Sequence, residues 1–429
     1  MLPMFHPESQ QLVDALGVSL TPALRTWLDE RVWTRGGGAE FSQALSTAQI
    51  VRPEEGTLWA GFMLPDTLPL ATNDYGDWLC SRFDTLGNVA EIVLWSHVGG
   101  DWLPYGRDWP EALLFDAAAE VLYWRRHEFQ VDEGGSNPPH AWAEWSADWL
   151  ARNGKNVDRF WHRDQRRDSD PLLALQRDGI AVAATEHDLL LRALDAELRA
   201  VLVPATAGKL AIAWEPDAVS WLFDTRLIPV PMRDRLAKFS RVAEDELFAQ
   251  DWQAAERHAL RLLSWRQDLG WAYDIAGWAA ERRGDIQLAV SRYLGGLRPS
   301  VFSDNTIRFR THWFADGFGK FSAARLNELR KEIPTPHRGD AYLSIYLAND
   351  NATLRNRIRD YWLNLADAAA VQGNHARAYA CYYNAGWDMG LQEMDDFRGI
   401  FRGLITHAES AGWSALAAIA RLHQQALPC

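Results

Sequence analysis

A spacing pattern that recurs between residue 236 and the C-terminus constrains the fold more than any other feature of the sequence. It is clearest around Gly277, where Tyr273 lies four positions earlier and a Gly-Asp pair begins seven positions later. Ala289, Tyr293 and Gly296 follow that pair at intervals of five, four and three. Small residues let two helices approach and receive large aromatic side chains, and a Gly-Asp turn ends a helix. The pattern therefore predicts a pair of packed helices.

The same pattern occurs four times in this part of the chain. A second clear copy is anchored on Ala366, and weaker copies are anchored on Ala243 and Ile405. The Ala243 copy precedes the Gly277 copy by 34 residues, a period that resembles tetratricopeptide repeats. The resemblance implies a helical array over residues 236–429. Residues 304–358 contain helical segments that do not keep its register.

The N-terminal third has a different pattern. Two helices divided near Gly17 are predicted from HPESQQLVDALGVSLTPALRTWLDERVW, with Thr21 as N-cap of the second and Pro22 at its first position. From Leu58 short strands are expected, and WLCSRF and VAEIVLWSHV, joined by Leu-Gly-Asn, predict an antiparallel hairpin. A further helix is predicted from WPEALLFDAAAEVLYWRRH. This order predicts an α+β domain with helices packed on one antiparallel sheet.

The order of four segments in this domain resembles the SUKH superfamily, which includes fungal regulators of cell-wall synthesis and many bacterial immunity proteins. The segments are LGVSLTPALRTWL, WAGFMLPDTLPLATNDYGDWLC, GNVAEIVLWSHVGGDW and WPEALL, and the similarity covers residues 10–117. The most telling parts are the stretch from Leu68 to Ala71, Gly76-Asp77, a strand ending in Cys80, and a second strand with Trp95 and His97. Three glycines stand where the family usually has two, and the stretch from Ala39 to Gly56 after them is not assigned.

Three parts are therefore predicted along the chain. Residues 1–117 form the SUKH-like α+β domain, residues 118–235 form a helical connecting region, and residues 236–429 form the tetratricopeptide-like helical array. The connecting region contains EGGSNPPH, from Glu133 to His140, which is typical of a linker or an exposed loop.

Negative charge is concentrated in the first domain. Residues 1–117 contain six Arg, no Lys and sixteen Asp or Glu, a net charge of −10 out of −13 for the whole chain. Such a domain would repel phosphate backbones and attract a cationic partner. The alternative is that the excess charge only confers solubility. The sequence has no run of eighteen apolar residues and no signal-peptide pattern, and its three Cys are far apart. A cytoplasmic protein without a membrane span is therefore expected.

The stretch PLATNDYGDWLCSRFD, residues 69–84, is a candidate metal or catalytic site because it combines acids with a cysteine and precedes His97. A metal site here would use Asp74, Asp77, Cys80, Asp84 and His97, of which Cys80 and a neutral His could bind zinc. However, residues three apart on a strand point to opposite faces, so these ligands do not converge. We instead expect Cys80 and Trp95 in the core and the Asp side chains in turns, where they bond to the backbone.

The other motifs tested for chemistry fail. The His127-Glu128 pair lacks the second His of a metalloprotease helix, and the sequence has no P-loop, dinucleotide fingerprint or nucleophile elbow. The Arg-rich run RFWHRDQRR, from Arg159 to Arg167, is flanked by Asp and is expected to be a solvated helix face. We therefore predict no enzyme activity, no cofactor, no metal and no direct nucleic-acid binding.

The resemblance to SUKH implies a non-enzymatic immunity protein that binds and neutralises a polymorphic or contact-dependent toxin from a neighbouring cell. Many such toxins act on nucleic acids and have basic clefts, which an acidic domain would suit. The candidate contact residues lie on turns at sheet ends: Asp74, Tyr75, Asp77, Asp84, Asp101 and Trp102. The alternative is an intracellular scaffold or regulator, as in cell-wall-synthesis regulation, whose helical repeats bind proteins. A third possibility is an enzyme whose site no motif reveals.

Overall fold

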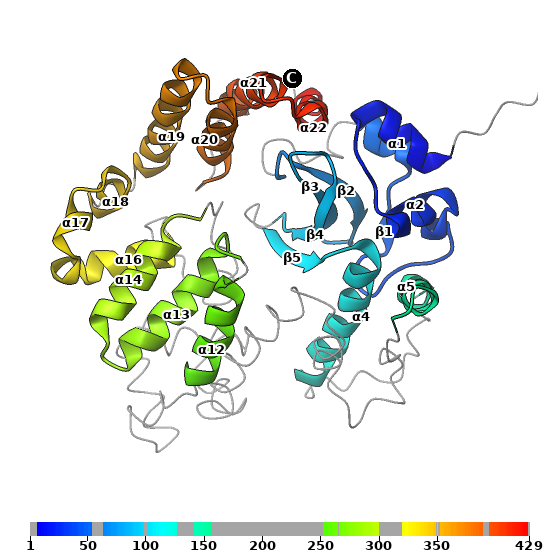
Figure 1. The fold of residues 1–429 in the computed structure, drawn as a ribbon. Helices are drawn as coiled ribbons and strands as arrows, with labels where there is room; N and C mark the ends of the chain where they lie inside the picture. The colour runs from blue at the N-terminus through cyan, green and yellow to red at the C-terminus, as the bar shows by residue number, and fades with distance from the viewer. Residues whose placement is uncertain are drawn as a thin grey trace, which may run out of the picture. The chain divides into compact units, whose positions relative to one another are not determined.

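The chain forms two compact units in the computed structural model (Figure 1). The structure describes residues 7–53, 63–97, 102–126, 141–155, 252–264, 266–299, 320–348, 350, 352–388 and 394–427. Unit 1 comprises Met1–Thr185, Trp362–Gly386 and Leu391–Cys429, and unit 2 comprises Glu186–Tyr361 and Trp387–Gly390. The last helices of the chain thus group with the N-terminal sheet, whereas the sequence placed them in a separate array.

Unit 1 is built on a five-stranded antiparallel sheet with the strand order β1-β2-β3-β4-β5. The strands are β1 (Gln43–Ala44), β2 (Thr67–Thr72), β3 (Trp78–Phe83), β4 (Val89–Trp95) and β5 (Trp102–Gly106). The predicted hairpin is confirmed, since β3 pairs with β4 and Gly87 adopts a φ of 80° in the turn between them. This left-handed conformation favours glycine.

The helices of unit 1 come from both ends of the chain. They are α1 (Glu8–Leu16), α2 (Pro22–Asp29), η1 (Val32–Thr34), α3 (Thr47–Val51), α4 (Trp109–Arg126), α5 (Ala141–Arg152), the last part of α19 (Leu354–Val371), α20 (His375–Trp387), α21 (Met394–Ser410) and α22 (Ser414–Gln425). The predicted break is confirmed at Gly17, whose φ is 67°. The predicted cap is also confirmed, since the Thr21 side chain accepts a hydrogen bond from the backbone N of Leu24 (3.2 Å). The unassigned stretch contains β1 and α3.

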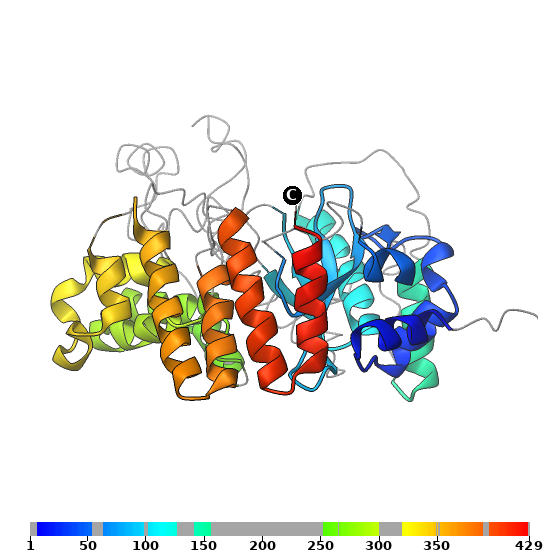
Figure 2. The same ribbon diagram turned by 90° about the horizontal axis from the view of Figure 1, so that it is seen from above.

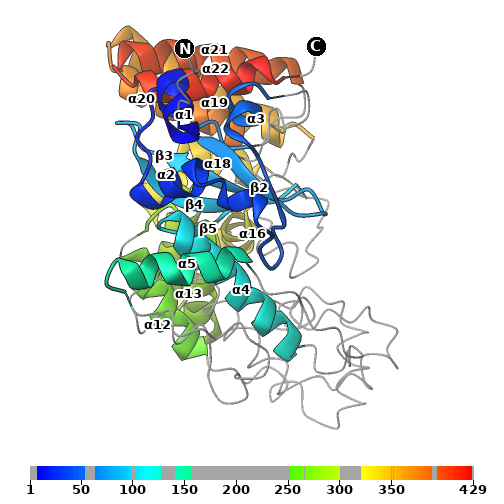
Figure 3. The ribbon, with the colours of Figure 1, turned by 90° about the vertical axis from the view of Figure 1, so that its right-hand side faces the viewer.

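Both faces of this sheet are covered. Consecutive residues of a strand point to opposite faces, and Leu79 and Cys80 are both fully buried. One face packs on α4, where the ring of Phe115 lies 4.6 Å from that of Tyr105 in β5. The other face is reached by Tyr383 of α20, which hydrogen-bonds to Asp66 just before β2, and by His423 of α22, which hydrogen-bonds to Thr67 at the start of β2. Figures 2 and 3 show α22 alongside the strands.

The run of three glycines after η1 allows α5 to pack closely against the backbone. The Gly37 carbonyl accepts a hydrogen bond from the backbone N of Trp142 (3.4 Å), and a Cβ on Gly36 would lie only 2.9 Å from Cβ of Ala141. The ring of Trp142 then packs edge to face on Trp27, with ring centroids 5.1 Å apart. The glycines therefore let α5 approach the backbone closely enough to bury its indole.

All the described secondary structure of unit 2 is helical. Its helices are α12 (Trp252–Leu263), α13 (Gly270–Arg282), α14 (Ile286–Gly296), α16 (Phe321–Glu328), η3 (Arg330–Glu332), α17 (Thr335–Arg338), α18 (Ala341–Leu347) and the first part of α19. The helix pair predicted around Gly277 is confirmed as α13 and α14, and the ring of Tyr293 packs directly on Gly277. Gly284 has a φ of 80° in the turn, and Asp285 caps α14 by accepting from the backbone N of Leu288 (3.2 Å).

The same packing of an aromatic ring on a glycine occurs in unit 1. The ring of Tyr382 in α20 lies directly against Gly403 in α21. Gly373 and Gly412 have φ values of 70° and 79° in the turns that follow α19 and α21. The copy predicted around Ala243 has its anchor outside the described residues. Glycine and aromatic side chains thus set the distance between paired helices in both units.

Leucine at the buried small positions of these helices is expected to destabilise the protein. Ala289 and Ala378 are fully buried, so Ala289→Leu and Ala378→Leu should each lower the free energy of unfolding by about 1–3 kcal/mol through overpacking. Ala380 is exposed on the same helix as Ala378, so Ala380→Leu should change it by less than about 0.5 kcal/mol. Urea unfolding of the three variants measures the difference, and three equally small effects would contradict this packing.

Candidate functional site

The turn between β2 and β3 is held from the interior by one side chain. Asn73, which is 4% exposed, accepts hydrogen bonds through Oδ1 from the backbone N of Tyr75 (3.0 Å) and of Asp77 (2.9 Å). An asparagine side chain that bonds to the backbone a few residues on is a common way to fix a turn. Because the turn is fixed in this way, it presents Asp74 and Tyr75 to solvent, and the Tyr75 side chain is 75% exposed.

Asp77 connects this turn to the end of β4. Its Oδ1 accepts a hydrogen bond from the backbone N of His97 (2.9 Å) and lies 2.8 Å from Nδ1 of the same residue. The second contact is a hydrogen bond when the proton is on Nδ1. The Asp77 carboxylate is therefore part of the support of the turn, whereas the Asp74 carboxylate is exposed beside Tyr75.

Sequence reasoning missed a third acid beside this turn. Glu40 lies in the stretch that had no assigned structure, and its Oε1 accepts a hydrogen bond from Nδ2 of Asn73 (2.9 Å). Gln43 in β1 donates to Oδ1 of Asp74 (3.0 Å). Strand β1 is only two residues long, which left no alternating pattern to find. We use the term acidic edge for Glu40, Asp74, Tyr75 and Asp77.

The negative charge of the acidic edge acts on a buried neighbour. Burial raises the pKa of Tyr105 well above its usual value, and the carboxylates of Asp116, Glu40 and Asp77 raise it further. Asp116 is 1% exposed and accepts a hydrogen bond from the backbone N of Ala39 (2.8 Å). Two carboxylates of the edge and a buried third one therefore all raise the pKa of the same hydroxyl.

The acidic edge contains three of the six predicted contact residues. Asp84 lies at the opposite end of β3, where its Oδ1 accepts from the backbone N of Leu86 and of Asn88 (2.9 Å each). Trp102 begins β5, and its ring lies against the guanidinium of Arg82. Asp101 lies outside the described residues. Asp84 is therefore separated from the other described residues of the set. As expected, the Asp77 and Asp84 side chains bond to the backbone, whereas the Asp74 side chain bonds to the Gln43 amide.

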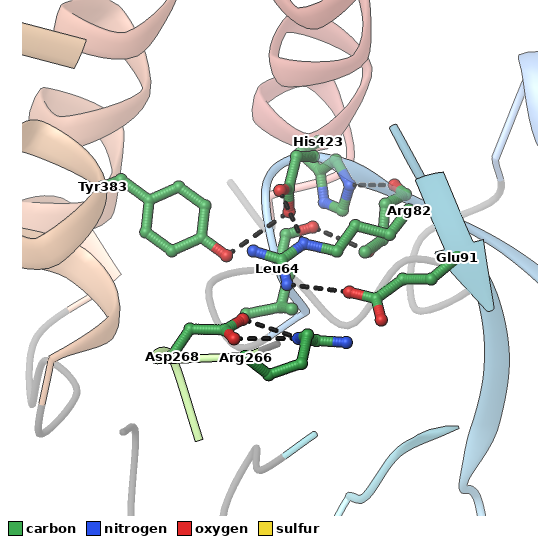
Figure 4. A network of polar contacts seen from close by, with 9 residues as sticks. Leu64, Arg82, Glu91, Arg266, Asp268, Tyr383 and His423 are labelled. Carbon is green, nitrogen blue, oxygen red and sulfur yellow. Dashed lines mark hydrogen bonds and ion pairs between the residues drawn. The ribbon is translucent and has the colours of Figure 1, made fainter. Parts of the chain in front are cut away.

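A second polar cluster lies on the sheet face reached by α20 and α22 (Figure 4). Arg82 of β3 donates through Nε to Oδ2 of Asp66 (2.9 Å) and through Nη1 to Oε1 of Glu91 (3.2 Å). The guanidinium carbon lies 4.8 Å from the centroid of the Trp102 ring. Tyr383 of α20 donates its hydroxyl to Oδ1 of Asp66 (3.3 Å). His423 bonds to the start of β2 beside this cluster. We use the term polar network for Asp66, Arg82, Glu91, Tyr383 and His423.

The environment fixes the charges in the polar network. Burial alone would lower the pKa of Arg82, but Asp66, with Tyr383 and Glu91, raises it well above its usual value. Burial and the Asp66 carboxylate raise the pKa of Tyr383. Burial lowers the pKa of His423, and its bond to the backbone and the charge of Asp66 only partly oppose this. At neutral pH the network thus holds a cationic Arg82, a neutral Tyr383 and a neutral His423.

Cys80, which lies beside the polar network, is not an activated nucleophile. Cys80, on the same face as Arg82, is fully buried, and burial raises the pKa of its thiol far above the range in which cysteine reacts as a thiolate. This confirms the core position expected for Cys80. Within the part of the chain that the structure describes, no three His, Cys, Asp or Glu side chains are grouped so as to hold a metal ion. The network joins the sheet to α20 and α22, and the acidic edge is the candidate for contact with another molecule.

Comparison with known proteins identifies no related family or curated protein. None of the described helices combines the length and the apolar character that crossing a bilayer requires.

Proposed function

We propose that this chain is a non-enzymatic cytoplasmic protein that binds and neutralises a cationic toxin domain delivered by a neighbouring cell. In this proposal the acidic edge is the contact surface, and no bond is made or broken on the chain. The toxin is a polymorphic or contact-dependent one that acts on nucleic acid, and the chain itself binds no nucleic acid. The resemblance of residues 10–117 to SUKH proteins supports this class of function.

The observation that carries the proposal is the combination found at the acidic edge. An aromatic side chain, Tyr75, is 75% exposed on a turn whose backbone is held by a buried Asn73. The carboxylates of Glu40, Asp74 and Asp77 belong to the same edge, and residues 1–117 carry a net charge of −10. Exposed tyrosines on rigid supports are typical anchors of protein interfaces, and surrounding charges accelerate the encounter with an oppositely charged partner.

Charge reversal at the acidic edge tests the proposal. The tagged full-length chain is used to capture its partner from the native host, and the captured toxin is then tested against Asp74→Lys by surface plasmon resonance. We expect the variant to lower the association rate constant by about tenfold at low salt, because a favourable charge becomes a repulsive one. The difference between the two chains should shrink in 0.5 M salt, since salt screens charges.

Asp14→Lys is the matched control for this experiment. Asp14 is exposed on α1 and accepts a hydrogen bond from a glutamine amide (Gln10, 2.7 Å), as Asp74 does from Gln43. Both variants change the net charge by the same amount, so a general field effect would slow both equally. Equal association rates for the two variants, or no captured toxin that kills cells lacking this chain, would contradict the proposal.

One observation in unit 2 favours a scaffold as the second candidate function. A surface cavity of 270 Å³ lies between α14 and the segment around α17, lined by Ser291, Leu294, Gly295, Arg298, His337 and Asp340. Arg298 forms an ion pair with Asp340 and lies 5.6 Å from the ring of Tyr342. Such a cavity suits a side chain of a peptide, and capture of a partner that Ser291→Trp abolishes and Asp74→Lys leaves intact would favour this candidate.

A further inference from the structure

A fully buried histidine joins α22 to the sheet. His423 is 0% exposed, and its Nε2 lies 2.8 Å from the backbone O of Thr67, so Nε2 carries the proton and donates. Nδ1 of the same ring is buried and has no hydrogen-bond partner, and the ring stacks on Phe401 of α21 at 5.9 Å. A proton added at Nδ1 would therefore place an unsatisfied donor and a charge inside the unit.

A pair of histidines joins α20 to α21. Nδ1 of His375 lies 3.1 Å from Nδ1 of His407, and their rings stack with centroids 5.3 Å apart. The ring of Tyr382 stacks on His407 at 5.4 Å. One Nδ1 must donate and the other must accept, so the bond tolerates one added proton but not two. His407 is 9% exposed, and burial together with the charge of His375 lowers its pKa.

The charged and titratable groups near these histidines do not offset the effect of burial on their pKa values. Around His423 they are Asp66 before β2, Arg82 of β3, Glu91 of β4, and Tyr379 and Tyr383 of α20. Around His407 they are Asp367 of α19 and His375 and Tyr382 of α20. Asp66 is already paired with the guanidinium of Arg82 (2.9 Å). The pKa of His423 and that of His407 are lowered in spite of the nearby Asp66 and Asp367.

We propose that α20, α21 and α22 form an acid-sensitive cover over one face of the sheet, which protonation of these histidines releases. In the open state His423 and His407 are solvated and take up a proton near pH 6.5, as free histidine does. Above that pH the histidines are neutral in both states and the cover is closed. Below that pH, protonation of each histidine raises the equilibrium constant for opening by up to about tenfold per pH unit. Opening uncovers the face that carries Cys80 and Trp95.

Hydrogen exchange of the full-length chain at pH 7.5 and pH 5.5 tests the cover. After correction for the intrinsic exchange rate, we expect the opening constants of peptides from α20–α22 and β2–β3 to rise about 10- to 100-fold at the lower pH. Peptides from α13–α14, whose described residues include no histidine, should change by less than threefold and serve as the internal control. Equal changes in both sets, or none in the first, would overturn the proposal.

Glutamine variants identify the groups responsible. His423→Gln keeps a side-chain amide donor for the Thr67 carbonyl but cannot be protonated, and His407→Gln removes one ring of the histidine pair. We expect the double variant to be protected at pH 7.5 and to lose most of the response at pH 5.5. Retention of the full response would overturn the proposal. If the double variant does not fold, the wild-type profile decides: opening that begins only below pH 5 would indicate carboxylates and refute the histidines.

Discussion

Replacement of Arg82 by Met is expected to lower the free energy of unfolding of unit 1 by about 3–5 kcal/mol. The side chains of Asp66 and Glu91 are only 11% and 13% exposed, and Arg82 is the cation between them. Methionine keeps the length of the apolar stem, so the loss comes from removing the cation that pairs with two largely buried carboxylates. Urea unfolding followed by hydrogen exchange of β3 peptides measures it, since a chain with two units need not unfold in one step.

A surface ion pair supplies the control for Arg82. Arg35 and Glu30 form a pair of 3.7 Å in which both side chains are about half exposed, so Arg35→Met should change the free energy by less than about 1 kcal/mol. Adding Asp66→Asn and Glu91→Gln to Arg82→Met should recover much of the loss, because the buried charges are then gone. A loss below about 1 kcal/mol for Arg82→Met alone would show that the network does not hold the sheet to its helices.

Local chemistry explains which elements of the fold the sequence predicts. Gly17, Thr21 and Pro22 act within one turn of helix, and the Leu-Gly-Asn connection acts between two adjacent strands, so their effects can be recognised in a short window of sequence. The contact between His423 and Thr67 joins residues 356 positions apart. No pattern within α22 marks that contact, because a histidine on a helix face is equally compatible with a solvent-exposed position.

Only part of the candidate site could be predicted, because local patterns can be recognised in a short stretch of sequence and long-range contacts cannot. The acids around Tyr75 were found because a turn with Asn, Asp and Gly is recognisable as a turn. Asp84 was grouped with them although the whole length of β3 separates Asp77 from Asp84. Arg82 was overlooked in the same stretch. The available signal was that Arg82 is a charged residue in a buried strand. In the pairing of β3 with β4 it lies opposite Glu91.

Two glycines of α21 are expected to respond with opposite signs to the same substitution. A Cβ on Gly403 would overlap the ring of Tyr382, which is stacked on His407 and cannot turn away freely. Gly403→Ala should therefore lower the free energy of unfolding by about 1–3 kcal/mol through overpacking. A Cβ on Gly399 meets no atom within 4 Å, so Gly399→Ala should raise stability by up to about 1 kcal/mol, since alanine favours helix.

The two variants should thus differ by about 1–4 kcal/mol, although they lie four residues apart on one helix and have identical composition. Thermal and urea unfolding under the same conditions measure this difference. Tyr382→Ala alone creates a cavity, but in combination with Gly403→Ala it should lose less stability than the sum of the single changes, because the overlap is removed. Additive effects, or a stabilising Gly403→Ala, would mean that the ring of Tyr382 does not set the distance between α20 and α21.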